Sequence, residues 1–214
     1  MSGPALPDGL WTDPRDAGAT RALYDDWADR YDADMAAAGM LGPVRVVEML
    51  EAMGVAKDVP VLDFGCGTGA CGAALAAAGY RDVSGRDISE GMIAKARARD
   101  VYRALEVVDP EAPIVVPERV GVVTACGSIC VGAAPAPVLG QVARAMTADS
   151  LLVVTLNDDT IRDADHVGAL AALQIDGTVR IERSEYGPQL PALGRGATVA
   201  ALRILGEAPS NAPA

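Results

Sequence analysis

The chain has 214 residues, of which 50% are hydrophobic and 22% charged, an ordinary composition for a soluble globular protein with a full core. Its formal net charge of −11 makes nucleic acid a poor partner, because such a surface repels phosphate backbones. No stretch approaches the roughly 18 apolar residues of a membrane span, and residues 1–13 lack the basic start and apolar run of a signal peptide. We therefore expect a cytoplasmic protein that binds neither nucleic acid nor membrane.

The residues that commonly bind metal are few and poorly spaced. None of the four cysteines forms a CxxC pair: they are Cys66, Cys71, Cys126 and Cys130. His166 is the only histidine. We therefore expect no metal site, and we expect reduced thiols, as is usual in the cytoplasm.

The first predicted helix follows an irregular, Gly- and Pro-rich arm over residues 1–12. It covers residues 13–38, where four apolar residues recur at helical spacing: Tyr24, Trp27, Tyr31 and Met35. Gly39 ends this helix, and Pro43 suits the first turn of a second one over residues 43–53.

Short apolar strands then alternate with helices of about ten residues. The predicted strands are 59–64, 82–86, 105–108, 120–126 and 151–156, and the predicted helices are 69–78, 89–99 and 137–146. This alternation predicts parallel βαβ units and a doubly wound α/β sheet. The basic residues Lys95, Arg97 and Arg99 are interpreted as the solvated face of one of these helices.

The C-terminal part breaks the alternation. A helix over 164–173 precedes two strand-like runs, 178–186 and 197–205, that are joined by a Gly/Pro-rich loop. Two such runs can pair antiparallel at the edge of a sheet. Residues 208–214 are small and polar, and we expect them to be disordered.

A glycine-rich turn follows the first predicted strand, in the run VLDFGCGTG over residues 61–69. Glycines there permit a tight turn and let the backbone approach a ligand closely, with a helix N-terminus behind it. Residues 67–72 also spell GxGxxG, the fingerprint of dinucleotide-binding proteins. The glycines alone therefore leave two classes of cofactor open.

Two acidic residues favour one of these two classes of cofactor. Asp63 ends the first strand, where a carboxylate would repel a pyrophosphate but attract the sulfonium and ammonium of S-adenosylmethionine, directly or through water. Asp87 ends the second strand, 20 residues after Gly67, and can accept hydrogen bonds from two ribose hydroxyls. Alternatively, both acids merely cap turns. Together they favour S-adenosylmethionine.

These segments resemble class I S-adenosylmethionine-dependent methyltransferases. The helix YDDWADRYD over residues 24–32, the glycine run, GRDISEGM over 85–92 and YRAL over 102–105 are similar to the Williams–Beuren-region methyltransferase-like group. The resemblance implies a Rossmann-like sheet of about seven strands, the seventh antiparallel beside the fifth, and an N-terminal helical lid. It divides the chain into an arm and lid (1–40), an S-adenosylmethionine-binding methyltransferase domain (41–207) and a tail.

The resemblance also implies where the cofactor and its product S-adenosylhomocysteine would bind. Gly65, Gly67 and Gly69 would line the methionine portion, and Asp87 would hold the ribose. Ile88, Val108 and Asp109 would lie at the adenine. The lid aromatics Tyr24, Trp27 and Tyr31 would close over the methionine end, although aromatics at this spacing are usually core residues. Further expected contacts are Asp63, Cys66, Met92, Cys126 and Gly127, the last two beneath the donor methyl.

Methyl transfer is an in-line displacement that needs aligned reactants, and it needs a base only if the nucleophile arrives protonated. Candidate catalytic groups are Tyr24, Tyr31 and His166. Candidate acceptor-binding residues lie at the ends of the fourth, fifth and sixth predicted strands: Ser128, Ile129, Asn157 and Tyr186. Asn157 can also belong to a solvated turn.

The function favoured is methyl transfer to a small-molecule acceptor. Two alternatives stay open: a protein or peptide methyltransferase, and a non-catalytic binder of S-adenosylmethionine or S-adenosylhomocysteine. Side chains that shield the donor methyl, with no cavity beside it, would favour the non-catalytic binder.

Overall fold

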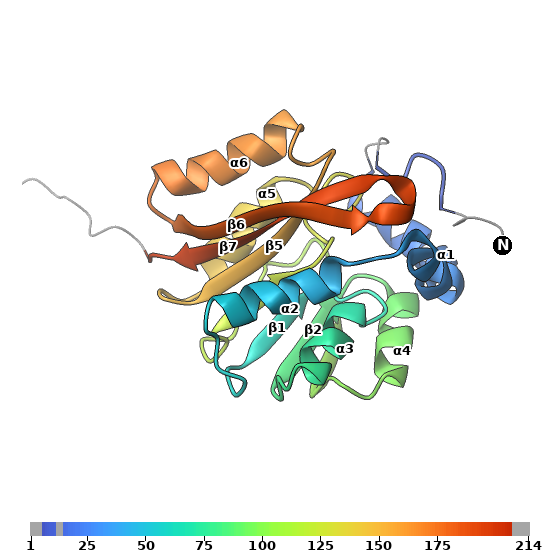
Figure 1. Ribbon diagram of the computed structural model, residues 1–214, viewed down its shortest axis with the longest axis horizontal. Coiled ribbons are helices and arrows are strands. Elements are labelled where there is room, and N and C mark those ends of the chain that lie inside the picture. The colour runs from blue at the N-terminus through green and yellow to red at the C-terminus, as the bar shows by residue number, and fades with distance from the viewer. Residues whose placement is uncertain (1–5, 12–14, 207–214) are drawn as a thin grey trace, which may run out of the picture.

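The computed structural model describes residues 6–11 and 15–206, which fold into a seven-stranded sheet flanked by helices (Figure 1). The strands are β1 (Val61–Phe64), β2 (Val83–Asp87), β3 (Ala104–Val107), β4 (Val122–Ala125), β5 (Leu151–Asn157), β6 (Val179–Leu190) and β7 (Arg195–Ile204). The helices are α1 (Ala17–Ala38), α2 (Gly42–Ala52), α3 (Ala70–Ala77), α4 (Glu90–Ala98), α5 (Pro137–Ala145) and α6 (Ala164–Ile175), with a short 3-10 turn at Pro191–Leu193. The predicted disordered tail lies outside the described residues.

The strand order is β3-β2-β1-β4-β5-β7-β6. The first five strands are parallel, and β7 is antiparallel to both β5 and β6. The predicted doubly wound sheet with an antiparallel edge is therefore confirmed. The order reverses between β1 and β4, and such a switch point opens a crevice at the carboxyl ends of the strands.

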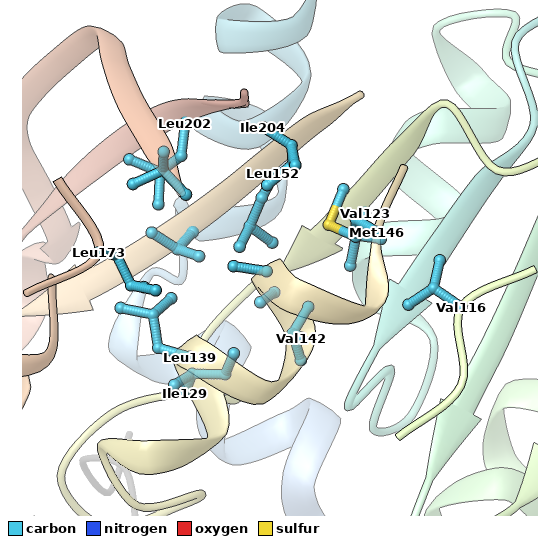
Figure 2. Close-up of a cluster of buried hydrophobic side chains, with 14 of the residues drawn as sticks. Val116, Val123, Ile129, Leu139, Val142, Met146, Leu152, Leu173, Leu202 and Ile204 are labelled. Carbon is cyan, nitrogen blue, oxygen red and sulfur yellow. The ribbon is translucent and has the colours of Figure 1, made fainter. Parts of the chain in front are cut away.

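Both faces of the sheet are buried, which explains the nearly continuous apolar runs of the central strands. In β5, Leu152 and Val154 pack toward α5 and α6, while Leu151 and Val153 pack toward α2 and α3. Figure 2 shows the first of these cores, in which side chains from α5, from Met146 just after it and from α6 pack against those of the strands. Leu139, Val142, Met146 and Leu173 lie in one cluster with Val123, Leu152, Leu202 and Ile204.

The β6–β7 hairpin differs from its prediction. We expected a strand to end at residue 186, but β6 continues to Leu190. Gly187 and Pro188 suggested a loop, yet β6 is an edge strand, where a proline is tolerated because no neighbour needs its missing N–H. The longer hairpin carries its turn beyond the sheet to α1 (Figure 1).

Helix α1 begins later than predicted. Asp16 accepts a hydrogen bond from the Ala19 N–H (2.7 Å), so it is the N-cap, and Ala17 is the first helical residue. The preceding arm is tied down by Arg15, which donates to the carbonyls of Leu10 (2.6 Å) and Gly132 (2.8 Å). None of the described helices is both long and apolar enough to cross a membrane.

Candidate cofactor-binding site

The glycine turn and Asp87 meet at the switch point of the sheet. The Asp87 carboxylate accepts hydrogen bonds from the N–H groups of Gly67 (2.8 Å) and Ser89 (2.9 Å). Burial raises its pKa, while these two donors act in the opposite direction. A carboxylate has about four acceptor positions, so two are left for a ligand.

The turn leaves open space above this carboxylate. Gly67 has a φ of +54° and Gly127 a φ of +73°, and a Cβ on either would meet no atom within 4 Å. Gly65, in contrast, leaves no room for a side chain, because a Cβ there would lie 2.3 Å from the Cβ of Ser128. Both glycine turns therefore border an open site.

A cavity of about 650 Å³ lies at this edge of the sheet. It brings together thirteen of the predicted site residues: Tyr24, Tyr31, Gly65, Cys66, Gly67, Asp87, Ile88, Met92, Val108, Asp109, Cys126, Gly127 and Ser128. They come from α1, from the first turn of α4 and from the carboxyl ends of β1 to β4. Such convergence, with a small number of polar groups, is typical of a small-molecule site.

Asp63 does not line this cavity. It is fully buried beneath the glycine turn, where it accepts hydrogen bonds from the hydroxyls of Tyr102 (2.7 Å) and Thr124 (3.0 Å). The Tyr102 hydroxyl in turn accepts a hydrogen bond from the Gly72 N–H in α3 (3.2 Å). We expected Asp63 to attract the ligand's positive charge, but its contacts make it a positioning residue that holds β4, Tyr102 and α3 together.

Burial raises the pKa of Asp63 to about 6, and we expect a stability change that follows from this. The unfolded carboxyl loses its proton near pH 4, whereas the folded one keeps it until about pH 6. Ionisation therefore destabilises the fold as the pH rises from about 4 to 6, by up to about 3 kcal/mol. Other acids change stability over the same range, so the measurement is the difference between the wild type and Asp63→Asn in urea unfolding. We expect the wild type to lose stability relative to this variant between pH 4.5 and 7, and a constant difference would contradict the assignment.

The aromatic stripe of α1 is part core and part cavity wall. Trp27 is buried and donates from Nε1 to Asp34 (2.8 Å), and its ring packs edge-on against Tyr31, with centroids 4.7 Å apart. Tyr24 and Tyr31 line the cavity, and burial raises the pKa of both phenols. They therefore stay protonated at neutral pH and can donate hydrogen bonds, but they are not bases.

A row of acids on α1 fastens this helix to the cofactor edge. Asp25 accepts from the Ser89 hydroxyl (2.5 Å) and the Gly91 N–H (2.9 Å), which places it at the start of α4. Asp29 pairs with Lys95 (2.6 Å). Lys95, which was interpreted as part of a solvated face of α4, keeps 42% of its side chain exposed while it pairs with α1.

Asp32 joins α1 to the glycine turn. It accepts from the Thr68 hydroxyl (2.6 Å) and from Arg99 (2.6 Å), and Arg99 also donates to the Thr68 carbonyl (2.6 Å). Thr68 is 1% exposed, whereas the Asp32 side chain is 51% exposed. We call Asp32, Thr68 and Arg99 the lid latch.

We expect Asp32→Ala to speed dissociation of S-adenosylhomocysteine about three- to tenfold, because opening α1 then breaks fewer interactions. Asp26→Ala is the matched control, since it removes the same charge from an exposed position of the same helix. Stopped-flow displacement measures both rates. Equal rates in the two variants would show that the latch does not hold the lid.

The remaining predicted residues lie apart from the large cavity. His166 is buried in α6, where its Nδ1 lies 2.6 Å from Asp163, and it does not line the large cavity. Tyr186 is 65% exposed and donates to Asp158 (2.9 Å). Ile129 is in the core, and Gly69 begins α3 behind the site.

Asn157 lies in a smaller cavity of about 70 Å³. Its Oδ1 accepts from the backbone N–H and the hydroxyl of Thr160 (2.9 and 2.8 Å). The two cavities share five wall residues, which are Tyr24, Tyr31, Met40, Cys126 and Gly127. We call these five residues the partition and the smaller cavity the second chamber.

Known structures define the class of this fold. A TehB-like SAM-dependent methyltransferase from Corynebacterium glutamicum superposes with a TM-score of 0.61 at 22% identity, covering 86% of this chain and 98% of that one. A SAM-dependent methyltransferase from Thiobacillus denitrificans, in complex with S-adenosyl-L-homocysteine, has a TM-score of 0.57 at 15% identity, covering 76% and 91%. The fold is therefore the class I methyltransferase fold.

The sequence agrees with this class. Residues 61–163 match the methyltransferase domain family, which confirms the predicted resemblance to methyltransferases. Methyltransferase-like protein 27 of Homo sapiens is 37% identical over 87 residues, which is 40% of this chain. That match spans only 36% of the length of the human protein.

Proposed function

We propose that this protein binds S-adenosylmethionine in the large cavity and transfers its methyl group to a small-molecule acceptor. The observation that carries the proposal is the Asp87 carboxylate, which is oriented by the Gly67 and Ser89 N–H groups and has acceptor positions left for two ribose hydroxyls. The same geometry would also suit NAD, but the match to the methyltransferase domain family favours S-adenosylmethionine.

Different residues of the cavity would bind different parts of the cofactor. Asp87 would hold the ribose, with Ile88, Val108 and Asp109 around the adenine and the glycine turn around the methionine portion. Bound S-adenosylmethionine supplies an electrophilic methyl on its sulfonium. Tyr24 and Tyr31 would exclude water and keep the acceptor in line, which is the main requirement of a displacement.

The second chamber supports a catalytic role over that of a non-catalytic binder. Cys126 and Gly127, which would lie beneath the donor methyl, belong to the partition, so a cavity adjoins the expected position of that methyl. At about 70 Å³ it has room for roughly five water-sized groups. A small molecule fits this space better than a stretch of peptide.

Calorimetric titration of the wild type with S-adenosylhomocysteine and, separately, with NAD tests the cofactor. We expect micromolar binding of S-adenosylhomocysteine and none of NAD, and the reverse would overturn the proposal. A screen with S-adenosylmethionine labelled on its methyl, over metabolites and over cell lysate, then separates the acceptors. Label found only in protein would favour a protein methyltransferase instead.

A further inference from the structure

The second chamber contains a buried polar atom without a partner. Gln189 lines the chamber from the end of β6, and its Oε1 is buried with no hydrogen-bond partner among the described residues. A buried acceptor without a donor is costly unless a ligand supplies one. The vacant hydrogen bond therefore indicates a ligand that carries an N–H or O–H.

This atom lies close to the expected position of the donor methyl. A Cβ on Gly42 would lie 2.7 Å from the Gln189 Nε2, 3.2 Å from its Oε1 and 3.2 Å from the Cys126 Sγ. The Gln189 amide and the Cys126 thiol, which belongs to the partition, therefore lie close to the same point beside Gly42. Gly42 lets them approach, because any larger residue would push the amide away.

The described walls of the chamber hold neither a histidine nor a carboxylate that could act as a general base, and their two thiols are those of Cys126 and Cys130. Burial keeps Tyr24 and Tyr31 protonated and raises the pKa of the Cys130 thiol to about 12, so these groups do not accept a proton at neutral pH. The one cation, Arg195, is paired with Asp159. The nucleophile must therefore attack without first losing a proton, which disfavours ordinary alcohols because a neutral hydroxyl oxygen is a weak nucleophile.

The shape of the chamber favours a flat ligand. Its walls include the rings of Trp11, Trp27, Tyr24 and Tyr31. Aromatic walls stack well on planar groups. Trp11 and Arg195 are partly exposed, and the Arg195 guanidinium lies 4.0 Å from the Trp11 ring centroid.

We propose that the acceptor is a compact, neutral nitrogen heterocycle whose N–H donates to Gln189 Oε1 while a second ring nitrogen attacks the methyl. This inference rests on the proposed function. The ring nitrogen's lone pair forms the new C–N bond as the C–S bond breaks, and its electron pair stays on sulfur. The products are S-adenosylhomocysteine and a methylated cation, which later releases its N–H proton to water, so no base is needed before attack.

Imidazole is the probe, and it is neutral at pH 8. On protein saturated with S-adenosylhomocysteine, ligand-observed NMR measures its affinity. With labelled S-adenosylmethionine, transfer to imidazole gives kcat and KM. We expect Gln189→Leu to weaken imidazole binding at least about tenfold and to raise KM more than it lowers kcat. Gln174→Leu, an exposed glutamine of α6, is the matched control and should change neither.

Two further probes isolate the vacant hydrogen bond. N-Methylimidazole keeps the attacking nitrogen but has no N–H, so it should bind weakly to the wild type and equally to Gln189→Leu. Cyclopentanol should accept no methyl group. Gln189→Glu restores an acceptor oxygen, so it should regain binding and shift the optimum for binding toward acid, where imidazole is a cation.

The outcomes separate the two proposals. If the wild type fails to bind S-adenosylhomocysteine, the proposed function fails and this inference with it. If it binds S-adenosylhomocysteine but takes imidazole and N-methylimidazole equally well, or if Gln189→Leu behaves as wild type, only the acceptor class is overturned. A thermal melt of each variant checks that the fold is intact.

Discussion

Asp87→Ala is expected to raise the dissociation constant of S-adenosylhomocysteine at least about a hundredfold. The substitution removes two hydrogen bonds from ribose hydroxyls to a charged acceptor, each worth about 1.5–3 kcal/mol. It also leaves the N–H groups of Gly67 and Ser89 without their acceptor, so the glycine turn loses its support. Calorimetric titration measures the change directly.

Two controls make the result specific to the ribose. Asp87→Asn keeps one acceptor oxygen and should cost about tenfold, between the wild type and the alanine variant. Asp176→Ala removes an exposed carboxylate at the end of α6 and should leave affinity unchanged. If Asp87→Ala bound the ligand as well as Asp176→Ala, Asp87 would be only a turn cap, the alternative that the sequence leaves open.

Gly72→Ala is expected to destabilise the fold by about 3 kcal/mol or more, although alanine normally favours a helix. A Cβ on Gly72 would lie 2.1 Å from the Tyr102 Cζ and 2.3 Å from its hydroxyl. The ring must then leave its place, which breaks its hydrogen bonds to Asp63 and to the Gly72 N–H. The free energy of urea unfolding measures the loss.

Gly168→Ala is the matched control for this prediction. Gly168 is also helical, in α6, but a Cβ there meets nothing within 4 Å. The same chemical change should therefore stabilise the protein by about 0.5–1 kcal/mol. Adding Tyr102→Ala to Gly72→Ala makes room for the new methyl, so the double variant should lose less than the sum of the single ones. Additive losses would show that the two residues do not clash.

The parts of the site that are read from short segments could be predicted. The run from Asp63 to Gly69 predicts a ligand-binding turn, because alternating glycines after a strand are typical of such turns. Asp87 follows at the end of the next strand. The direction in which a side chain points was harder to predict. Asp63 was expected beside the ligand, but a strand residue alternates its face, and this one turns down to Tyr102 and Thr124.

Other residues around the site could not be recognised from any pattern in the sequence. Gln189 lies 125 residues beyond Phe64 in a segment that read as a loop, and only the long hairpin brings it to the partition. Lys95 and Arg99 looked like ordinary surface charges, because their partners belong to a helix more than 60 residues earlier. The domain boundaries, the cytoplasmic location and the roles of the individual site residues stay predictions.

The sequence by itself determined the alternation of strands and helices, the glycine turn and the acid that ends the second strand, because each depends on residues close together in the chain. Only the tertiary structure decided which acid faces the cavity, what fastens the lid and where the second chamber lies. Those features depend on contacts between α1, the ends of β1 and β4, and the β6–β7 hairpin. Their pairing follows from the packing of the whole sheet, which no local pattern encodes.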